Sequence, residues 1–213
     1  MKINSPYYTI KEAGIHEIIV KKSRFICQLK RVTTEKEAQD FIAEMKKKHY
    51  KATHNCSAFI LRTTPLIKKS SDDGEPSGTA GLPMLEVLEK KQLTGVVTVT
   101  TRYFGGIKLG TGGLIRAYTK SVSESLETIG LVKGELYYPQ LFTLTYSQQN
   151  TFTYFLQQHP QYQLKDITYG ENLSCLVMVK EEDIPVFQLA LTNLFHGKIN
   201  FTTGSATYFE TPV

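Results

Sequence analysis

A glycine-rich segment flanked by basic residues is the part of this chain best suited to hold an anion. Residues 100–120 read TTRYFGGIKLGTGGLIRAYTK, with five glycines between positions 105 and 113, here called the glycine loop. Glycines let a backbone approach a phosphate closely, and a helix that starts after them presents unpaired N–H groups. The residues expected to bind an anion or a nucleic acid are Arg102, Tyr103, Gly105, Gly106, Lys108, Gly110, Gly112, Gly113 and Arg116.

The glycine loop matches neither of the common nucleotide-binding motifs. A P-loop requires Lys and then Ser or Thr after its second glycine, but Thr111 and Gly112 follow Gly110. The dinucleotide pattern GxGxxG begins at Gly110 but has Ile115 where its last glycine belongs. Two interpretations remain: an anion site without a nucleotide motif, or a tight packed turn whose cations face solvent.

A second loop concentrates carboxylates. Residues 70–81 read SSDDGEPSGTAG, here called the acidic loop, and contain Asp72, Asp73 and Glu75. Such a cluster could bind Mg²⁺ or transfer protons, although Asp before Gly is also ordinary turn chemistry. A further hypothesis is that these acids pair with the cations of the glycine loop and fix both loops.

One histidine precedes an apolar strand. His54, followed by Asn55, could act as a general base if a carboxylate lies beside it. Ser77 lacks the surroundings of a hydrolase nucleophile, and the other histidines form no zinc-ligand spacing with Cys or carboxylates. We therefore expect no resident metal or cofactor, and a binding protein rather than an enzyme.

The charge of the chain is unevenly distributed. Residues 1–134 carry 22 Lys and Arg against 13 Asp and Glu, whereas residues 135–213 carry 3 against 7. A basic first part favours an anionic partner. Aromatic residues beside the cations, Tyr103 and Phe104, suit single-stranded RNA, although aromatics after a strand also commonly enter a core.

Composition indicates a cytoplasmic protein. No run of 18 apolar residues exists, so we expect no membrane span, and the N-terminus lacks the apolar stretch of a signal peptide. The three cysteines, Cys27, Cys56 and Cys175, are too widely spaced for a CxxC pair. We expect them to be reduced thiols in the core.

Hydrophobic periodicity predicts alternating elements in the first part of the chain. Residues 14–32 predict one long strand or two paired strands, and Thr33 or Thr34 can cap a helix whose buried face holds Ala38, Phe41, Ile42 and Met45. The further elements expected are a strand at 56–63, a loop at 65–81, a helix at 83–92, a strand at 95–104 and a helix at 114–130.

A change of composition near Gly134 predicts a boundary between two domains, 1–134 and 135–213. The second domain is expected to hold a strand at 136–146, a helix at 148–158, strands at 161–169 and 173–180, a helix at 183–195 and a strand at 201–209. The order βαββαβ is that of a ferredoxin-like sandwich, which makes the chain an α+β protein.

Three long strings resemble one known family. ATHNCSAFIL (52–61), SSDDGEPSGTAGLPMLEVL (70–88) and GVVTVTTRYFGGIKLGTGGLIRAYTKSV (95–122) closely resemble the YigZ/IMPACT family, as does KKSRFIC (21–27). Ser57 is a departure, since bacterial members often have an aromatic residue there. The resemblance implies a first domain like domain 2 of ribosomal protein S five and domain IV of elongation factor G. It also implies a second domain like domain V of that factor.

The resemblance also suggests hypotheses about the function. Eukaryotic relatives regulate translation through an extra N-terminal domain, and this chain starts directly with the shared domain, so that partner is not carried over. The first hypothesis is a non-enzymatic translation regulator that binds RNA, the ribosome or a translation factor through its basic first domain, with no DNA specificity. The alternative is an enzyme for a small phosphorylated or carboxylated ligand, with the glycine loop as anion site and the acidic loop for metal or acid–base chemistry. A third option makes the acidic second domain a protein-docking module.

Overall fold

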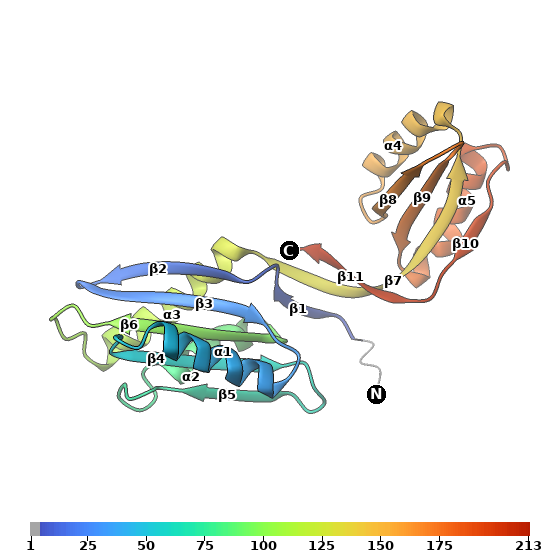
Figure 1. Ribbon diagram of the computed structural model, residues 1–213. Coiled ribbons are helices and arrows are strands. Elements are labelled where there is room, and N and C mark those ends of the chain that lie inside the picture. Colours follow the sequence, from blue (N-terminus) through green and yellow to red (C-terminus); the bar gives the residue numbers. More distant parts are fainter. Residues whose placement is uncertain (1–4) are drawn as a thin grey trace. The chain divides into compact units, whose positions relative to one another are not determined.

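The computed structural model describes residues 5–213, which form two compact units (Figure 1). The first unit contains Tyr7–Lys133 together with Thr211–Val213, and the second contains Gly134–Glu210 with Ser5 and Pro6. Both helices and strands occur in each unit, so the protein is of the α+β class with two sheets.

A five-stranded antiparallel sheet organises the first unit. Its strand order is β2-β3-β6-β4-β5, so the central strand β6 lies between β3 and β4. The elements of this unit are β1 (Tyr7–Ile10), β2 (Gly14–Val20), β3 (Ser23–Arg31), α1 (Glu35–Lys48), β4 (His54–Leu61), β5 (Ile67–Ser71), α2 (Gly81–Lys90), β6 (Val96–Tyr103) and α3 (Thr111–Ile129).

Helices cover both faces of this sheet, with α1 on one face and α2 and α3 on the other (Figure 1). The side chains of β4 pack into the cores on both faces of the sheet. Cys56, Ala58 and Ile60 point into the core beneath α2 and α3, whereas Phe59 and Leu61 join the core beneath α1. A strand covered on both faces is apolar throughout, which explains why this stretch has no polar alternation.

Local capping fixes the start of α1. The hydroxyl of Thr34 accepts a hydrogen bond from the backbone N–H of Glu37 at 3.2 Å, and the Glu37 carboxylate accepts one from the Thr33 N–H at 2.7 Å. Such reciprocal bonds satisfy N–H groups that no helical carbonyl can reach. The buried residues of α1 are the four expected from its periodicity, Ala38, Phe41, Ile42 and Met45.

Several sequence-based boundaries are wrong, including that of the strand expected at 136–146, which begins five residues earlier, at Leu131. The stretch 65–81, expected to be a loop throughout, contains the edge strand β5, whose exposed Lys68 and Lys69 mask its regularity. Exposed lysines are common on edge strands because they discourage pairing with another chain. The helix α3 begins at Thr111, three residues earlier than expected, because Gly112 and Gly113 form part of its first turn.

The second unit packs two helices against a sheet in which β8, β9, β7 and β10 are neighbours in that order and antiparallel; β1 and β11 also pair with β7. Phe142, Phe152, Phe155 and Phe187 dominate the core. The strand expected at 201–209 is two short strands. The elements are β7 (Leu131–Leu144), α4 (Gln149–Gln158), β8 (Gln163–Tyr169), β9 (Leu173–Val179), α5 (Ile184–Leu194), β10 (Phe201–Thr203) and β11 (Thr207–Pro212), with single 3₁₀ turns at Tyr146–Gln148 and Glu181–Asp183.

Within residues 5–213, no helix is both long and apolar enough to cross a membrane.

Candidate functional site

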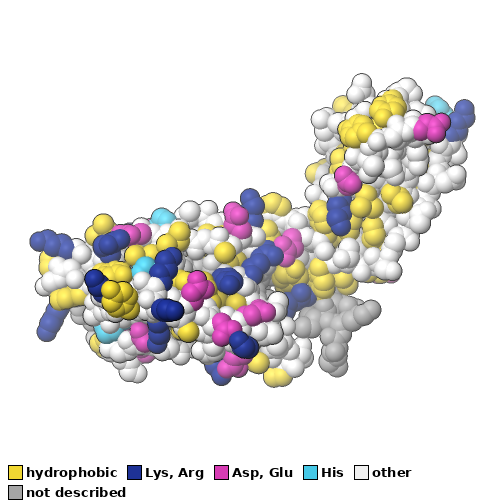
Figure 2. Space-filling model, viewed as in Figure 1, with side chains coloured by type: hydrophobic (Ala, Val, Ile, Leu, Met, Phe, Trp, Pro, Cys, Tyr) yellow, Lys and Arg dark blue, Asp and Glu magenta, His cyan; other side chains and the backbone are white. Residues whose placement is uncertain are grey.

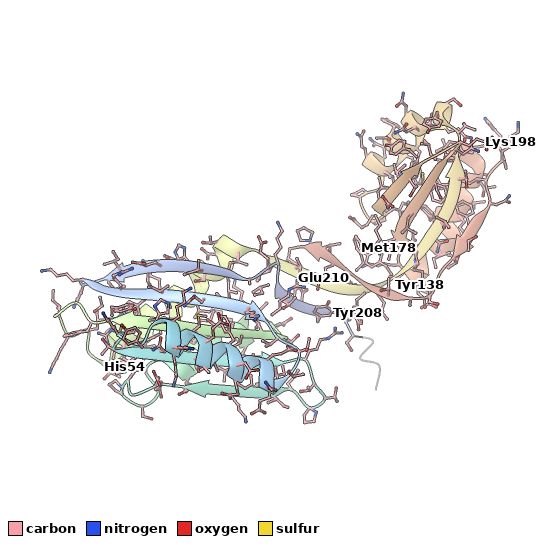
Figure 3. The ribbon with its side chains drawn as sticks, viewed as in Figure 1. His54, Tyr138, Met178, Lys198, Tyr208 and Glu210 are labelled. Carbon is pink, nitrogen blue, oxygen red and sulfur yellow. The ribbon has the colours of Figure 1, made fainter. Side chains whose placement is uncertain are left out.

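The pairing of β4 with β6 brings the candidate residues of three segments to one end of the first sheet. His54, at the start of β4, lies opposite Arg102 near the end of β6. Figure 3 labels His54 at this end of the unit. The acidic loop follows β5, the other neighbour of β4, and therefore returns to the same end.

Arg102 and Glu75 form a buried ion pair. The Oε1 atom of Glu75 accepts hydrogen bonds from Arg102 Nη1 at 2.7 Å and from the Tyr118 hydroxyl at 2.8 Å. The side chains of Arg102 and Glu75 are only 7% and 2% exposed. Arg102 was expected to be an accessible contact for nucleic acid, but most of its guanidinium is enclosed. The hypothesis that the acidic loop pairs with a cation beside the glycine loop describes Glu75 correctly.

The remaining guanidinium atoms of Arg102 are not hydrogen-bonded. Its Nε atom is buried without a partner among the described residues, and its Cζ atom lies 5.4 Å from the ring centre of Phe25 and 5.5 Å from that of Phe104. Aromatic faces attract a guanidinium through their quadrupole but do not replace a hydrogen-bond acceptor.

His54 is held in one orientation by the acidic loop. Its Nδ1 atom lies 2.8 Å from the backbone oxygen of Asp73, so this nitrogen donates the hydrogen bond. In the neutral ring, Nε2 then carries the lone pair. Nε2 lies 3.8 Å from Glu75 Oε2, a distance too long for a direct hydrogen bond.

Asp72 organises the acidic loop. Its carboxylate accepts hydrogen bonds from the backbone N–H groups of Gly78 at 2.9 Å, Ala80 at 3.0 Å and Gly81 at 2.8 Å. Partial burial tends to raise the pKa of Asp72, but these three N–H groups outweigh it and the pKa is lowered. The carboxylate also supplies the cap that Ala80, at the N-cap position of α2, cannot provide.

Asp73 ties the same loop to two other elements. One of its carboxylate oxygens accepts the backbone N–H of Asn55 at 2.7 Å, and the other lies 2.5 Å from Lys46 Nζ on α1. Asn55 is buried and accepts a hydrogen bond from the Thr101 hydroxyl at 2.7 Å. The three acids thus engage different partners, and no group of three or more metal-ligating side chains gathers within residues 5–213.

Cys56, next to these residues, is an unreactive thiol. Its Sγ atom lies 3.0 Å from the backbone oxygen of Asp72 and 3.3 Å from the Tyr118 hydroxyl. Burial raises the pKa of the Cys56 thiol far above its ordinary value. A thiol is a poor nucleophile compared with a thiolate, so Cys56 belongs to the core. Cys27 and Cys175 are likewise buried and unpaired.

The glycines of the glycine loop occupy positions that favour glycine for different structural reasons. A Cβ atom at Gly105 would lie 2.1 Å from the backbone of Lys22, so this glycine allows the turn between β2 and β3 to pack closely. Gly110 has a φ of +70° and is the N-cap of α3. Gly112 and Gly113 lie in the first helical turn, close to the N–H groups that no carbonyl of the helix can accept.

The two aromatic residues that the sequence suggested for RNA, Tyr103 and Phe104, differ in exposure. Tyr103, expected to contact nucleic acid, is half-buried, and its hydroxyl lies 3.0 Å from His49 Nδ1. Phe104 is 47% exposed and Tyr50 is 75% exposed, and both lie at the same end of the sheet. Periodicity could not show this, because Tyr103 is the last residue of β6 and Phe104 is the first residue of the loop that follows, where the alternation of the strand no longer applies.

Exposed lysines from three loops and from the last turn of α1 surround this end of the sheet. Hydrogen bonds join the loops: Thr53 N–H donates to Arg102 O at 2.9 Å, and Phe104 N–H donates to the Thr53 hydroxyl at 3.1 Å. Within residues 5–213, none of these lysines makes an ion pair. Figure 2 shows Lys and Arg side chains projecting at the left end of the first unit. The members of this basic rim are Lys21, Lys22, Lys48, Lys51 and Lys108.

The sequence identified only Lys108 of the basic rim. The other four lysines are far from the glycine loop along the chain and carry no motif. Arg116, the remaining cation that the sequence singled out, is exposed on the second turn of α3, near Gly112.

A cleft of about 430 Å³ separates the acidic loop from the glycine loop. Arg102, Glu75 and His54 line it together with Lys108 and the start of α3 at Thr111. The fold therefore brings residues predicted in three separate segments, His54, Glu75, Arg102, Lys108 and Gly110, to one cleft, while Asp72, Asp73 and Asn55 hold the acidic loop in place.

Comparison with known proteins gives matches to both parts of the chain. The sequence model described as "Impact N-terminal domain" matches residues 21–126, and the one described as "Domain of unknown function (DUF1949)" matches residues 142–198. The "IMPACT family member YvyE" of Bacillus subtilis is 50% identical over 97% of this chain and 95% of its own length. An "IMPACT family member" of Haemophilus influenzae is 34% identical over 91% of this chain and 94% of its own.

A solved structure described as "Crystal structure of an hypothetical protein" has a similar fold. It is 27% identical, covers 92% of this chain and 96% of its own, and superposes with a TM-score of 0.56. The similarity therefore extends over both units.

Proposed function

The chain belongs to the IMPACT family, and from this premise we propose that it is a non-enzymatic regulator of translation that binds RNA through the basic rim. The observation that carries the proposal is that five exposed lysines, none of them in an ion pair within the described part of the chain, gather around one end of the first unit. Unpaired lysines keep their full attraction for phosphate, because no neighbouring carboxylate competes for them.

Exposed aromatic rings among the lysines favour single-stranded RNA as the ligand. Tyr50 and Phe104 stand among the lysines, and Lys51 Nζ lies 5.6 Å from the ring centre of Tyr50. Bases stack on such rings while lysines follow the backbone, and this combination is tolerant of sequence. Neither feature reads base pairs in a groove, so no DNA specificity is expected.

The finer fold relationships point the same way. We infer that the second unit is a ferredoxin-like sandwich similar to domain V of elongation factor G, supported by its strand order β8-β9-β7-β10 and its two helices. The family resemblance likewise implies a first unit like domain 2 of ribosomal protein S five and domain IV of that factor. These are domains of proteins that work on the ribosome, which favours RNA as the ligand.

The test is binding of the purified chain to single-stranded RNA and to ribosomes at two salt concentrations. Contacts with four or five phosphates predict that log K falls with log salt with a slope of about −3 for a single strand. The variant Lys21→Glu/Lys22→Glu/Lys51→Glu should lose about tenfold or more in affinity and show a shallower slope. Arg102 is unsuitable for this test, because its replacement would leave Glu75 buried without its cation.

The matched control reverses three exposed lysines outside the rim. Lys11, Lys90 and Lys91 lie near the ends of strands and helices at the opposite end of the sheet, so their reversal changes the net charge equally. Equal loss in both variants, or RNA binding that ignores salt, would overturn the proposal. Binding to a translation factor without RNA binding would replace RNA with a protein partner.

A further inference from the structure

The cleft between the acidic and glycine loops contains polar groups that the fold leaves without partners. It adjoins the surface proposed for RNA and shares Lys108 and Phe104 with it, but its other walls are the buried Arg102 and Glu75 and the start of α3. Its volume of about 430 Å³ is in the range of small-molecule sites.

Arg102 is the first of these groups. The residue is 5% exposed, yet of its guanidinium only Nη1 has a hydrogen-bond acceptor, the Glu75 carboxylate. Within residues 5–213, neither Nε nor Nη2 has an acceptor. Nε is enclosed by the protein, so the N–H groups of Nη2 are the ones that an oxygen atom supplied by a ligand can reach and satisfy.

The N-terminus of α3 is the second group. The helix is 19 residues long, and its first intrahelical bond from this end runs from Leu114 N–H to Gly110 O at 2.9 Å. The N–H groups of Thr111, Gly112 and Gly113 precede that bond, and no side chain caps them. They point away from the helix and carry the positive end of its dipole, which favours an anion.

The opposite wall presents acceptors. His54 Nδ1 donates to Asp73 O, which leaves the Nε2 lone pair beside Glu75 Oε2 at 3.8 Å. Two acceptors at this separation do not bond each other, but a hydroxyl placed between them can donate to one and lie close to the other. The cleft thus offers donors on one wall and acceptors on the other.

We propose that this cleft binds a hydroxyl-bearing phosphate monoester. Phosphoryl oxygens would accept hydrogen bonds from the N-terminus of α3, from Arg102 and from the exposed Lys108, while a hydroxyl of the same molecule donates to His54 or Glu75. A phosphoryl group suits the site better than a carboxylate, because three oxygens can use donors that converge from three segments of the chain. The half-exposed ring of Phe104 offers a surface for the body of the ligand.

The probes are inorganic phosphate and ribose 5-phosphate, with ribose as the uncharged control. They are titrated into the full ¹⁵N-labelled chain while amide spectra are recorded. The backbone signals of Thr111, Gly112 and Gly113 and the Nε–H signal of Arg102 should shift with both phosphates and not with ribose. Ribose 5-phosphate should bind about tenfold more tightly than phosphate, because only it can reach His54 and Glu75 as well. If these signals do not move at about 20 mM of either phosphate, which would fill a site with a Kd of about 1 mM, the proposal is wrong.

Two variants at exposed positions test the donors without touching the buried pair. Lys108→Ala removes a charge, and Thr111→Pro removes one N–H at the first helical position, where proline is well tolerated. Each should weaken ribose 5-phosphate binding about threefold to tenfold. Lys120→Ala, an exposed lysine further along α3, is the matched control and should bind like the wild type. Unchanged binding in both test variants would overturn the proposal.

A further arm identifies the source of the phosphate. A short RNA carrying a 5′-phosphate is compared with the same RNA ending in a 5′-hydroxyl. If the phosphorylated RNA binds more tightly than the 5′-hydroxyl RNA, and if this difference disappears in Lys108→Ala, the result supports the site and assigns it to an RNA end. Equal binding of the two RNAs, together with ribose 5-phosphate binding, supports the site and assigns it to a free metabolite. Because Lys108 is not replaced in the variant that tests the basic rim, the two proposals fail independently.

Discussion

The acidic loop and the glycine loop face each other across one cleft, but they use their polar groups differently. Every carboxylate of the acidic loop is engaged by the fold: Asp72 by backbone N–H groups, Asp73 by Asn55 and Lys46, and Glu75 by Arg102. The glycine loop instead ends at a helix start without a side-chain cap, and Lys108 beside it is exposed. Unsatisfied groups are those that can still bind a ligand, so the glycine loop is the binding side and the acidic loop its support.

The largest effect is expected from replacing Glu75, which tests whether the acidic loop has a structural role. Glu75→Ala leaves Arg102 buried without its counter-ion, so we expect the free energy of unfolding of the first unit to fall by about 3–5 kcal/mol. Native-state hydrogen exchange of the β4 and β6 amides measures this for the first unit by itself. The double variant Glu75→Leu/Arg102→Met should recover much of the loss, since it removes both charges. A small effect of Glu75→Ala would mean that the acidic loop is not structural.

Glycines within the glycine loop should differ from one another. Gly105→Ala places a Cβ atom 2.1 Å from the backbone of Lys22, and we expect it to cost about 1–3 kcal/mol. Gly112→Ala meets only the end of the Arg116 side chain at 3.5 Å and should change stability by less than about 0.5 kcal/mol. Thermal unfolding of both variants checks this. Equal destabilisation would show that the loop tolerates no side chain anywhere.

Asp72 should stabilise the first unit in a pH-dependent way. Asp72→Ala removes three charge-assisted hydrogen bonds, and we expect a loss of about 1–3 kcal/mol at neutral pH. The pKa of Asp72 is lowered in the folded state, so its contribution is complete above about pH 3.9 and is lost as the pH falls through the folded value. Urea unfolding at pH 7 and at pH 3 should therefore show a difference between wild type and Asp72→Asn that shrinks at low pH. A difference that grows at pH 3 would contradict the assignment.

The ion pair of Asp73 with Lys46 should contribute least. The Lys46 side chain is 46% exposed, and exposed ion pairs stabilise by less than about 1 kcal/mol. Lys46→Ala should leave the free energy of unfolding, measured by urea, within about 1 kcal/mol of the wild type. Asp73→Ala also leaves the backbone N–H of the buried Asn55 without an acceptor and should lower the free energy of unfolding by more. Similar effects of the two changes would mean that the Asn55 contact does not matter.

Much of the fold could be predicted from local patterns. The buried face of α1 follows from the spacing of Ala38, Phe41, Ile42 and Met45, and Thr34 caps it as its side chain allows. The strand β5 could not be predicted, because its residues after Ile67 are all polar and exposed and therefore lack the alternation that marks a strand. Its strand conformation comes from pairing with β4, a tertiary contact.

The candidate site was predictable in membership but not in role. The residue types suggested that Arg102 would bind an anion and that the carboxylates would bind a metal or pair with cations. Whether Arg102 meets a ligand or Glu75 depends on the register of β4 with β6 and on the path of the acidic loop. No local rule fixes these, since both are set by contacts between distant parts of the chain.

The sequence by itself determined the family, through long strings shared with its relatives, and the basic character of its first part, through a simple excess of lysine and arginine. Only the tertiary structure decided which charges are available. In the folded protein the carboxylates of the acidic loop accept hydrogen bonds from other groups of the chain, and Arg102 is paired with Glu75, because a buried charge must be paired. Within residues 5–213, the tertiary structure left the start of α3 without a side-chain cap and the lysines of the basic rim without ion pairs at one end of the sheet, and this is where a ligand can bind.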